Sequence, residues 1–252
     1  MLRNINTFSW KQLEDMPHRE DIVILLPISS LEQHGPQLPI GTDDFMLQMV
    51  LDALIGSDKI VGDMLVLPTL HFGLSPEHLD FTGTFTLSPQ TMMGVVEDII
   101  RCMRIHGYRH LLLLNSHGGN TGLLHALAQT WNRQYDVEIY HIDIWGGGLF
   151  ERAAHLLKTP VENDVHGGEI ETSILMFTGQ TTMTAEEIAN SVDYLNPIPA
   201  NRGSWTAKEL SDSGAIGGVS QSTAETGRKL SKFMIEDVAG QINSLSVQTK
   251  TR

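Results

Sequence analysis

Residues 21–44 read DIVILLPISSLEQHGPQLPIGTDD, an apolar run followed by a polar loop. The nearly continuous apolar run from Ile22 to Ile28 is typical of a strand covered on both faces, as in a parallel sheet. The polar loop Leu31–Asp44 follows the carboxyl end of that strand directly. In open α/β sheets, ligands bind at this end of the strands.

The loop carries three groups that bind divalent metal, namely Glu32, His34 and Asp43. Glycines allow the sharp bends that would bring Asp43 back towards the other two, and prolines stiffen the loop. A flexible loop would lose more entropy in holding three ligands at one point, so the prolines favour a preorganised metal site. A polar surface loop is the alternative. The bending and stiffening residues are Gly35, Pro36, Pro39 and Gly41.

Composition is that of an ordinary globular protein, with 41% hydrophobic and 19% charged residues in a chain of 252. We expect a single domain over residues 1–252, because this length can bury a sizeable core without disulfides. No apolar run approaches the roughly 20 residues needed to span a bilayer. The N-terminus has no signal-peptide pattern, and the single Cys102 cannot form an internal disulfide, so we expect a cytoplasmic protein.

The net charge of −13 opposes binding to nucleic acid, because such proteins gain most of their affinity from Lys and Arg that neutralise phosphates. We therefore expect a small-molecule substrate and neither a nucleic-acid nor a membrane partner. Bound divalent metal would offset part of the negative charge.

Apolar spacing further along the chain predicts the alternating strands and helices of an α/β fold with a parallel sheet. The predicted strands are 21–28, 64–67, 110–114 and 137–144. The predicted helices are 9–16, 43–54, 88–106, 121–134, 149–157, one beginning near residues 166–171, and 223–245. Residues 70–84 are expected to form a functional loop, and residues 196–218 an irregular covering segment.

Two more polar clusters lie at strand ends or helix starts. His117 follows the strand 110–114, and His166 with Glu169 opens a helix, where Glu171 is a further candidate. Together with the first loop they would bring five or six carboxylate and imidazole groups to one sheet edge, more than a mononuclear site needs. Two metals bridged by Asp43 and a water would use them all. Acidic residues are also favoured by the dipole at a helix N-terminus, which gives the two glutamates an ordinary explanation.

Such a metal pair would lower the pKa of the bridging water to near neutrality, from about 15.7 in bulk, and so supply hydroxide at pH 7. One metal could also polarise a substrate carbonyl. His166 and Glu169 are the candidates for carrying the proton from the water to the leaving nitrogen. Oxygen and imidazole ligands without thiolate suit Zn, Mn or Fe.

The remaining histidines and the cysteine have structural interpretations. His117 alone could be a turn residue, although the two glycines after it favour close approach of a ligand. His71 and His78 are expected to be loop or subunit-contact residues rather than ligands. Cys102 is expected to be an apolar filler. Solvent-exposed or structural roles are expected for His106, His110, His125 and His155.

Three motifs taken together resemble the creatininase (creatinine amidohydrolase) superfamily. They are Glu32-Gln-His-Gly-Pro with Thr42-Asp43, Asn115-Ser-His-Gly-Gly-Asn, and His166-Gly-Gly-Glu-Ile-Glu-Thr-Ser. The loop Gly73-Leu-Ser-Pro-Glu-His and the glycines near the end also resemble that family, so the match covers nearly the whole chain in order.

The resemblance implies a single α/β domain with a mostly parallel sheet between helices, and a homo-oligomer, commonly a hexamer. It also implies a dinuclear Zn, Mn or Fe centre that hydrolyses a cyclic amide, formamide or related C–N bond. By position, the family's metal ligands match Glu32, His34, Asp43 and His117, with Asp43 as the bridge. His166 matches a substrate-facing histidine.

This chain also departs from creatininase itself, which has a carboxylate where Gly119 stands and aromatic residues where Gly118 and Glu162 stand. Our hypothesis is that Glu169 supplies the missing carboxylate. The leading functional hypothesis is a metal-dependent amidohydrolase. The alternatives are hydrolysis of a C–C or lactone bond in an oxidised inositol or sugar-like ring, and a metal-binding protein without catalysis.

Overall fold

The computed structural model describes residues 1–195, 198 and 202–249, and within them a five-stranded sheet. Its strands lie in the order β1-β3-β2-β4-β5, and every neighbouring pair is parallel. Their bounds are β1 Leu2–Asn4, β2 Val23–Ile28, β3 Met64–Val66, β4 His110–Asn115 and β5 Glu138–Asp143. The predicted α/β fold with a parallel sheet is confirmed.

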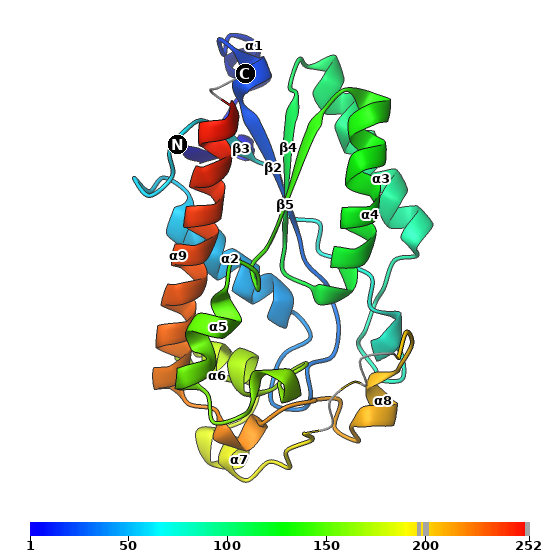
Figure 1. The fold of residues 1–252 in the computed structure, drawn as a ribbon, viewed down its shortest axis with the longest axis vertical. Helices are drawn as coiled ribbons and strands as arrows, with labels where there is room; N and C mark the ends of the chain where they lie inside the picture. The colour runs from blue at the N-terminus through cyan, green and yellow to red at the C-terminus, as the bar shows by residue number, and fades with distance from the viewer. Residues whose placement is uncertain (196–197, 199–201, 250–252) are drawn as a thin grey trace.

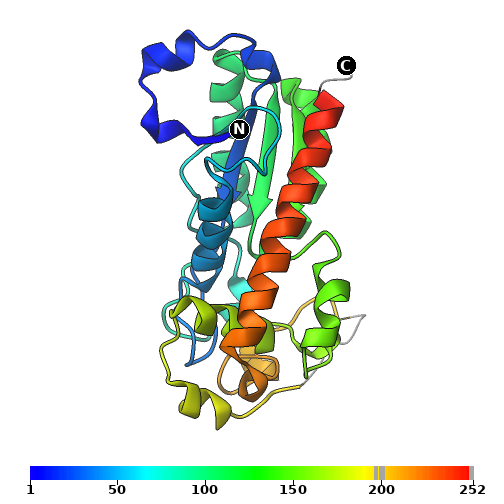
Figure 2. The ribbon, with the colours of Figure 1, turned by 90° about the vertical axis from the view of Figure 1, so that its left-hand side faces the viewer.

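Helices cover both faces of the sheet (Figure 1). On one side, which faces the viewer in Figure 2, lie α2 (Thr42–Leu54), α6 (Glu169–Thr178) and the long α9 (Ala224–Thr249). On the other lie α3 (Pro89–Ile105) and α4 (Gly118–Tyr135). Alternate residues of β2 enter two separate apolar cores, Leu25 the first and Ile24 the second. Burial on both faces explains why this strand is apolar at every position.

Several helices differ from the sequence-based bounds. The helix expected from residue 121 begins at Gly118, so His117 is its N-cap residue. Strand β1 was not predicted, because three residues carry too little pattern. The other helices are α1 Trp10–Glu14, α5 Leu149–Ala153, α7 Ala185–Ala189 and α8 Ala207–Leu210. Short 3₁₀ turns occupy Ile5–Thr7, Arg19–Asp21, Pro76–His78, Ala154–Leu156, Val161–Asn163 and Val219–Gln221.

The carboxyl ends of β2 and β4 lie side by side at the point where the order of connections reverses. From β2 the chain continues to β3 on one side, and from β4 to β5 on the other. This switch point is where ligands bind in open α/β sheets. It therefore brings the loops after β2 and β4 together.

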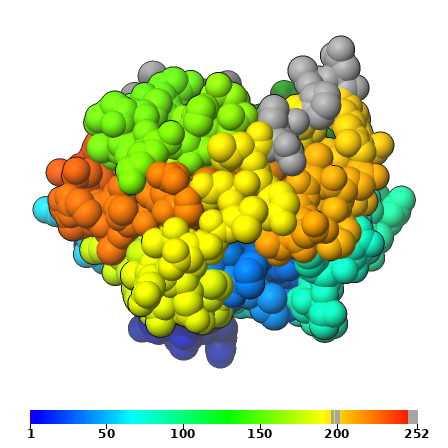
Figure 3. Space-filling model, turned by 90° about the horizontal axis from the view of Figure 1, so that it is seen from below, coloured from blue at the N-terminus to red at the C-terminus, as the bar shows by residue number. Residues whose placement is uncertain are grey.

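The chain between α6 and α9 runs across the lower end of the molecule (Figures 1 and 3). In Figure 3, which views the molecule from below, this stretch spans yellow to orange and covers much of that end. It includes most of the predicted covering segment 196–218, of which residues 196–197 and 199–201 lie outside the described residues. Among the described helices, none is both long and apolar enough to cross a membrane.

Candidate metal centre

Four of the predicted ligands converge at the carboxyl edge of the sheet. Glu32 and His34 lie in the loop after β2, Asp43 in the first turn of α2, and His117 at the end of β4. Nδ1 of His117 lies 3.2 Å from Oε2 of Glu32 and 3.5 Å from Oδ2 of Asp43. Nε2 of His34 lies 3.8 Å from Oδ1 of Asp43. The two oxygens of Asp43 therefore face different histidines, which is the arrangement of a bridging carboxylate.

The fifth metal-binding group at this point is the carboxylate of Glu171 and not that of Glu169. Oε1 of Glu171 lies 3.7 Å from Nε2 of His34. Glu169 is buried elsewhere, where its carboxylate accepts hydrogen bonds from the backbone amides of Lys158 and Thr159, the latter at 2.7 Å. Residues i and i+2 of a helix point in nearly opposite directions, so only one of the two glutamates can face the centre. The structure therefore does not bring Glu169 to the other ligands.

Backbone carbonyls orient the histidines. Nδ1–H of His34 donates to the carbonyl of Glu32 at 3.1 Å, and Nε2–H of His117 donates to the carbonyl of Leu74 at 2.8 Å. We assign the outer N–H of each ring from these partners, so the other ring nitrogens face the carboxylates and can bind metal once they lose their protons. Bonds of this kind fix the ring orientation of metal-binding histidines.

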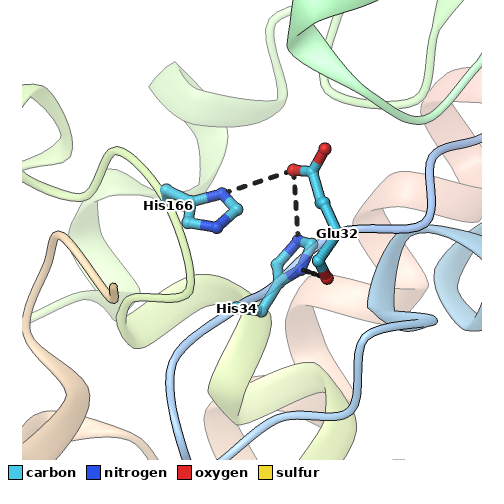
Figure 4. A group of neighbouring side chains, drawn as sticks. All are labelled: Glu32, His34 and His166. Carbon is cyan, nitrogen blue, oxygen red and sulfur yellow. Dashed lines mark hydrogen bonds and ion pairs between the residues drawn. The ribbon is translucent and has the colours of Figure 1, made fainter. Parts of the chain in front are cut away.

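His166 and His78 complete the wall of the centre. Nε2–H of His166 donates to the carbonyl of Gln33 at 2.6 Å, which leaves Nδ1 facing Oε1 of Glu32 at 3.7 Å (Figure 4). The ring of His78 stacks on that of His166 with centroids 4.0 Å apart. His78 was expected in a loop or subunit contact, but it is buried against the centre. The motif Gly73-Leu-Ser-Pro-Glu-His was the signal that could have found it.

The donor atoms fit divalent cations. Oε1 of Glu32, Nε2 of His34 and Oδ2 of Asp43 are buried without a hydrogen-bonding partner in the described part of the chain. A buried polar atom without a partner costs about 1–3 kcal/mol, which a bound cation would offset. Donor atoms within 4.8 Å of one another form three groups here. Two of them share Asp43, namely Glu32, Asp43 and His117, and His34, Asp43 and Glu171; the third is Glu32, His34 and His166.

Without metal, the rings of His34 and His117 hold an additional proton at pH 7. Burial alone would lower the pKa of His117, but Glu32 and Asp43 raise it to about 10. The pKa of His34 likewise lies well above its usual value despite burial, because of Glu171 and Asp43. Burial and the charge of Glu32 raise the pKa of Asp43 to about 6. Burial and His34 lower the pKa of His166 to about 4, so this ring is neutral at pH 7 and can accept a proton.

By the resemblance described above, Gly119 takes the place of a carboxylate residue, and the structure shows what a side chain would meet there. A Cβ atom on Gly119 would lie 2.3 Å from the carbonyl oxygen of Leu74 and 2.4 Å from Nε2 of His117. It would push apart the hydrogen bond that orients His117. The departure from the motif is therefore tied to how this histidine is held.

A cavity of about 360 Å³ opens above the centre. Its lining includes the aromatic side chains of Trp145, Phe150 and Trp205, and the backbone of Gly118 and Gly119. Among the described residues, no Lys or Arg lines it. The three motifs do not predict that these aromatic residues line the cavity, because the residues come from other segments of the sequence.

The model of the creatininase family, described as creatinine amidohydrolase, matches residues 6–242. The mycofactocin precursor peptide peptidase of Mycobacterium tuberculosis is 26% identical over 228 residues, covering 87% of this chain and 84% of that protein. The creatinine amidohydrolase of Pseudomonas putida is 32% identical over 122 residues, covering 46% of this chain and 45% of that protein.

Solved structures share the fold. A structure described as creatininase with Mn has a TM-score of 0.74 at 21% identity and covers 97% of this chain and 98% of its own. A second, described as creatinine amidohydrolase, has a TM-score of 0.72 at 23% identity, with 96% of each chain covered. The family match over nearly the whole length and the shared fold lead to one conclusion: this chain belongs to the creatininase family.

Proposed function

We propose that the chain is a metal-dependent amidohydrolase that cleaves the C–N bond of a small cyclic amide or formamide. The observation that carries this proposal is the pair of ligand groups that share Asp43, with buried donor atoms lacking partners. We propose two divalent cations, Zn, Mn or Fe, held by Glu32, Asp43 and His117 on one side and by His34, Asp43 and Glu171 on the other. When bound, such a pair lowers the pKa of water towards neutrality and polarises a carbonyl oxygen.

The residues around the centre have separate roles in this proposal. Neutral His166 offers Nδ1 as the proton acceptor, because its Nε2–H is held by the carbonyl of Gln33. Glu77 also lines the cavity, and burial raises its pKa, so it is a second group that can hold a proton near a leaving nitrogen. Glu169 anchors backbone amides instead and takes no part in proton transfer.

The cavity restricts the substrate. Five carboxylates line it, from Glu32, Asp43, Glu77, Asp164 and Glu171. Two divalent cations would supply four positive charges, which leaves no surplus to bind a phosphorylated or carboxylated compound. The aromatic side chains favour a flat, uncharged or cationic group, since aromatic faces attract both. A small amide or formamide satisfies these conditions.

A peptide C–N bond is the second candidate. Its support is that the mycofactocin precursor peptide peptidase aligns with 87% of this chain, whereas the creatinine amidohydrolase aligns with 46%. A cavity of about 360 Å³ could hold one or two terminal residues of a peptide.

The test is turnover by the metal-reconstituted chain on formamides, lactams, short peptides, lactones and oxidised inositols. We expect hydrolysis of a formamide or lactam with Zn, Mn or Fe, and none by the Asp43→Asn variant. Cleavage of peptides alone would select the second candidate. Activity confined to lactones or inositols, or none with any metal, would contradict both.

Substitution of Trp205 tests whether the substrate binds in this cavity. Its ring lies edge-on to His78 with centroids 6.2 Å apart and lines the cavity above the metals. Trp205→Ala should raise KM about 3- to 10-fold and change kcat little, because an aromatic contact is worth about 0.5–1.5 kcal/mol. Trp10→Ala is the control, since Trp10 is 74% exposed outside the cavity. An unchanged KM for Trp205→Ala would remove this residue from the substrate site.

We also propose that the chain forms a homo-oligomer. Large apolar side chains are exposed around the start of α2 and in the loop after β3, and these two segments meet where Gly83 approaches Ile40. Exposed apolar surface of this kind marks subunit contacts. Light scattering after size-exclusion chromatography should give a multiple of 27.9 kDa. The exposed residues are Ile40, Phe45, Phe72, Leu79 and Phe85.

A further inference from the structure

A second group of metal-binding side chains lies away from the centre described above. His141 and Asp143 are two residues apart on β5 and so share one face of that strand, and His125 lies on α4, which packs against it. Donor atoms of the three residues lie within 4.8 Å of one another. None of the three lines the cavity above the first centre. We name this group the β5 cluster.

His141 is the residue that points to a ligand. Its side chain is only 6% exposed, and neither ring nitrogen makes a well-aligned hydrogen bond within the described part of the chain. Nε2 has the carboxylate of Asp143 as an ion-pair neighbour at 3.2 Å, and Nδ1 is buried without a hydrogen bond. Burying polar nitrogens without partners costs free energy, so native structures pair them with protein, water or an ion. An ion bound between His141 and its neighbours would satisfy this ring.

The distances suit a transition-metal ion. Nε2 of His141 lies 3.2 Å from Oδ1 of Asp143. Two ligands of a tetrahedral zinc ion, each about 2.0–2.1 Å from the metal, are separated by about 3.3 Å. The rings of His125 and His141 are 4.5 Å apart at an interplanar angle of 81°, so they approach from different directions.

Asp143 is already held in place by neighbouring residues. Its Oδ1 accepts hydrogen bonds from Nδ2 of Asn115 at 2.6 Å and from Oγ1 of Thr121 at 3.0 Å. Hydrogen bonds to a ligating carboxylate orient it for metal. His125 is exposed and provides the route by which an ion reaches the buried His141.

We propose that the β5 cluster is a separate binding site for one zinc ion, with His125, His141 and Asp143 as ligands and a fourth position open to water. Two imidazoles and one carboxylate suit Zn²⁺ and disfavour Mg²⁺ or Ca²⁺, which prefer oxygen ligands. The site is also connected to the first centre, because Nδ2 of Asn115 donates to the carbonyl of His117 at 2.7 Å.

The test is the number of zinc ions retained per chain after equilibrium dialysis, compared between variants. His125→Gln should bind one zinc ion fewer than the unmodified chain, and His141→Gln should do the same. His106→Gln is the control, because His106 is also an exposed histidine, at the carboxyl end of α3, but lies outside both clusters. It should bind as many ions as the unmodified chain.

Two further measurements separate this site from the first centre. In an Asp43→Asn background, one zinc ion should remain and should be lost when His125→Gln is added, whether or not the enzyme activity proposed above is correct. Anomalous diffraction at the zinc edge should give a peak about 2 Å from His125 and His141. Because His125 is exposed, its substitution should not prevent folding. Equal zinc content in the unmodified chain and His125→Gln would overturn the proposal.

Discussion

The two clusters use the same residue types, but the protein holds them differently. At the centre beside β2 and β4, the outer nitrogens of His34 and His117 donate to backbone carbonyls, and both rings are buried. In the β5 cluster, neither His125 nor His141 makes a hydrogen bond to backbone within the described residues. Within the described part of the chain, Asp143 is the member of this cluster that hydrogen bonds from Asn115 and Thr121 hold in place.

This difference implies that the two clusters bind metal with different affinities. Rings whose outer nitrogen is held by a backbone carbonyl lose little freedom when a metal binds, whereas rings without that hydrogen bond must be oriented by the metal itself. Loss of such a supporting partner lowers metal affinity about 10- to 100-fold in other metal sites. We therefore expect tight binding at the first centre and weaker, exchangeable binding at the β5 cluster.

The largest effect should come from Asp43→Asn. Asp43 belongs to both of the ligand groups that we propose to hold the two metal ions, so its loss should release both ions. Turnover should fall about 10³-fold or more, since the metals supply several kcal/mol of transition-state stabilisation. Metal analysis and kinetics on the same sample test this, and the β5 cluster should keep its ion.

Asp44→Asn is the matched control for that variant. Asp44 lies in the same turn of α2 and carries the same charge, but it contacts Ser29 and His71 outside the centre. It should retain both ions and near-normal turnover. If both variants keep their metal, Asp43 is not the bridge.

The next largest effect on turnover is expected from one of two glutamates on α6, and the other glutamate serves as the comparison. Glu171→Gln should remove the ion shared with His34 and lower turnover roughly 100-fold. Glu169→Gln should keep both ions and instead lower the free energy of unfolding by about 1.5–3 kcal/mol, because it weakens charge-assisted bonds to buried amides. Metal counts and urea unfolding of both variants provide the measurement. The reverse pattern, with metal lost from Glu169→Gln alone, would restore Glu169 as the ligand.

These two glutamates show which parts of the site could be predicted from the sequence and which could not. The strand 21–28, the loop after it and His117 could be placed at one sheet edge, because parallel strands bring their carboxyl ends together. The choice between Glu169 and Glu171 could not be made, because it depends on where α6 begins and how it is rotated. That rotation is set by packing of α6, with buried residues such as Ile170 and Ile174, against α9 and α2.

The residues that the sequence analysis placed elsewhere are those defined by tertiary contacts alone. His78 reaches the centre because the loop after β3 folds back to form bridges with β2 and its following loop. Trp145 and Trp205 line the same cavity although they are sixty residues apart in the sequence. No periodicity marks such positions.

A smaller effect should follow from disturbing the backbone support of His117 without touching any ligand. Gly119→Ala places a Cβ against the carbonyl of Leu74 and Nε2 of His117. We expect metal affinity at the first centre to fall about 10- to 100-fold, towards that of the β5 cluster. Competition with a chelator of known affinity measures the change.

Gly122→Ala is the control for that substitution. It lies in the same helix, and a Cβ atom there meets nothing within 4 Å. Alanine should stabilise the helix by about 0.5–1 kcal/mol and leave metal affinity unchanged. If Gly119→Ala also leaves affinity unchanged, backbone support does not explain the difference between the two clusters.

The smallest effect is a dependence on pH that arises at the first centre. The pKa of His117 rises from 6.5 to about 10 on folding, and that of His34 also rises. Their charges therefore stabilise the metal-free fold fully below about pH 6.5, and this contribution is lost as pH rises towards 10. The Tm of the metal-free chain should fall between pH 7 and pH 10, whereas metal should replace the protons and reduce that fall.

The same two protons must leave when metal binds, because a protonated imidazole has no lone pair for the cation. At pH 7.5 we expect release of about two protons per chain on filling the first centre, and an affinity that rises with pH. Calorimetric titration with Zn²⁺ in two buffers of different ionisation enthalpy gives the number. An identical heat in both buffers would show that His34 and His117 are already neutral, and the charge balance inferred for the metal-free centre would be wrong.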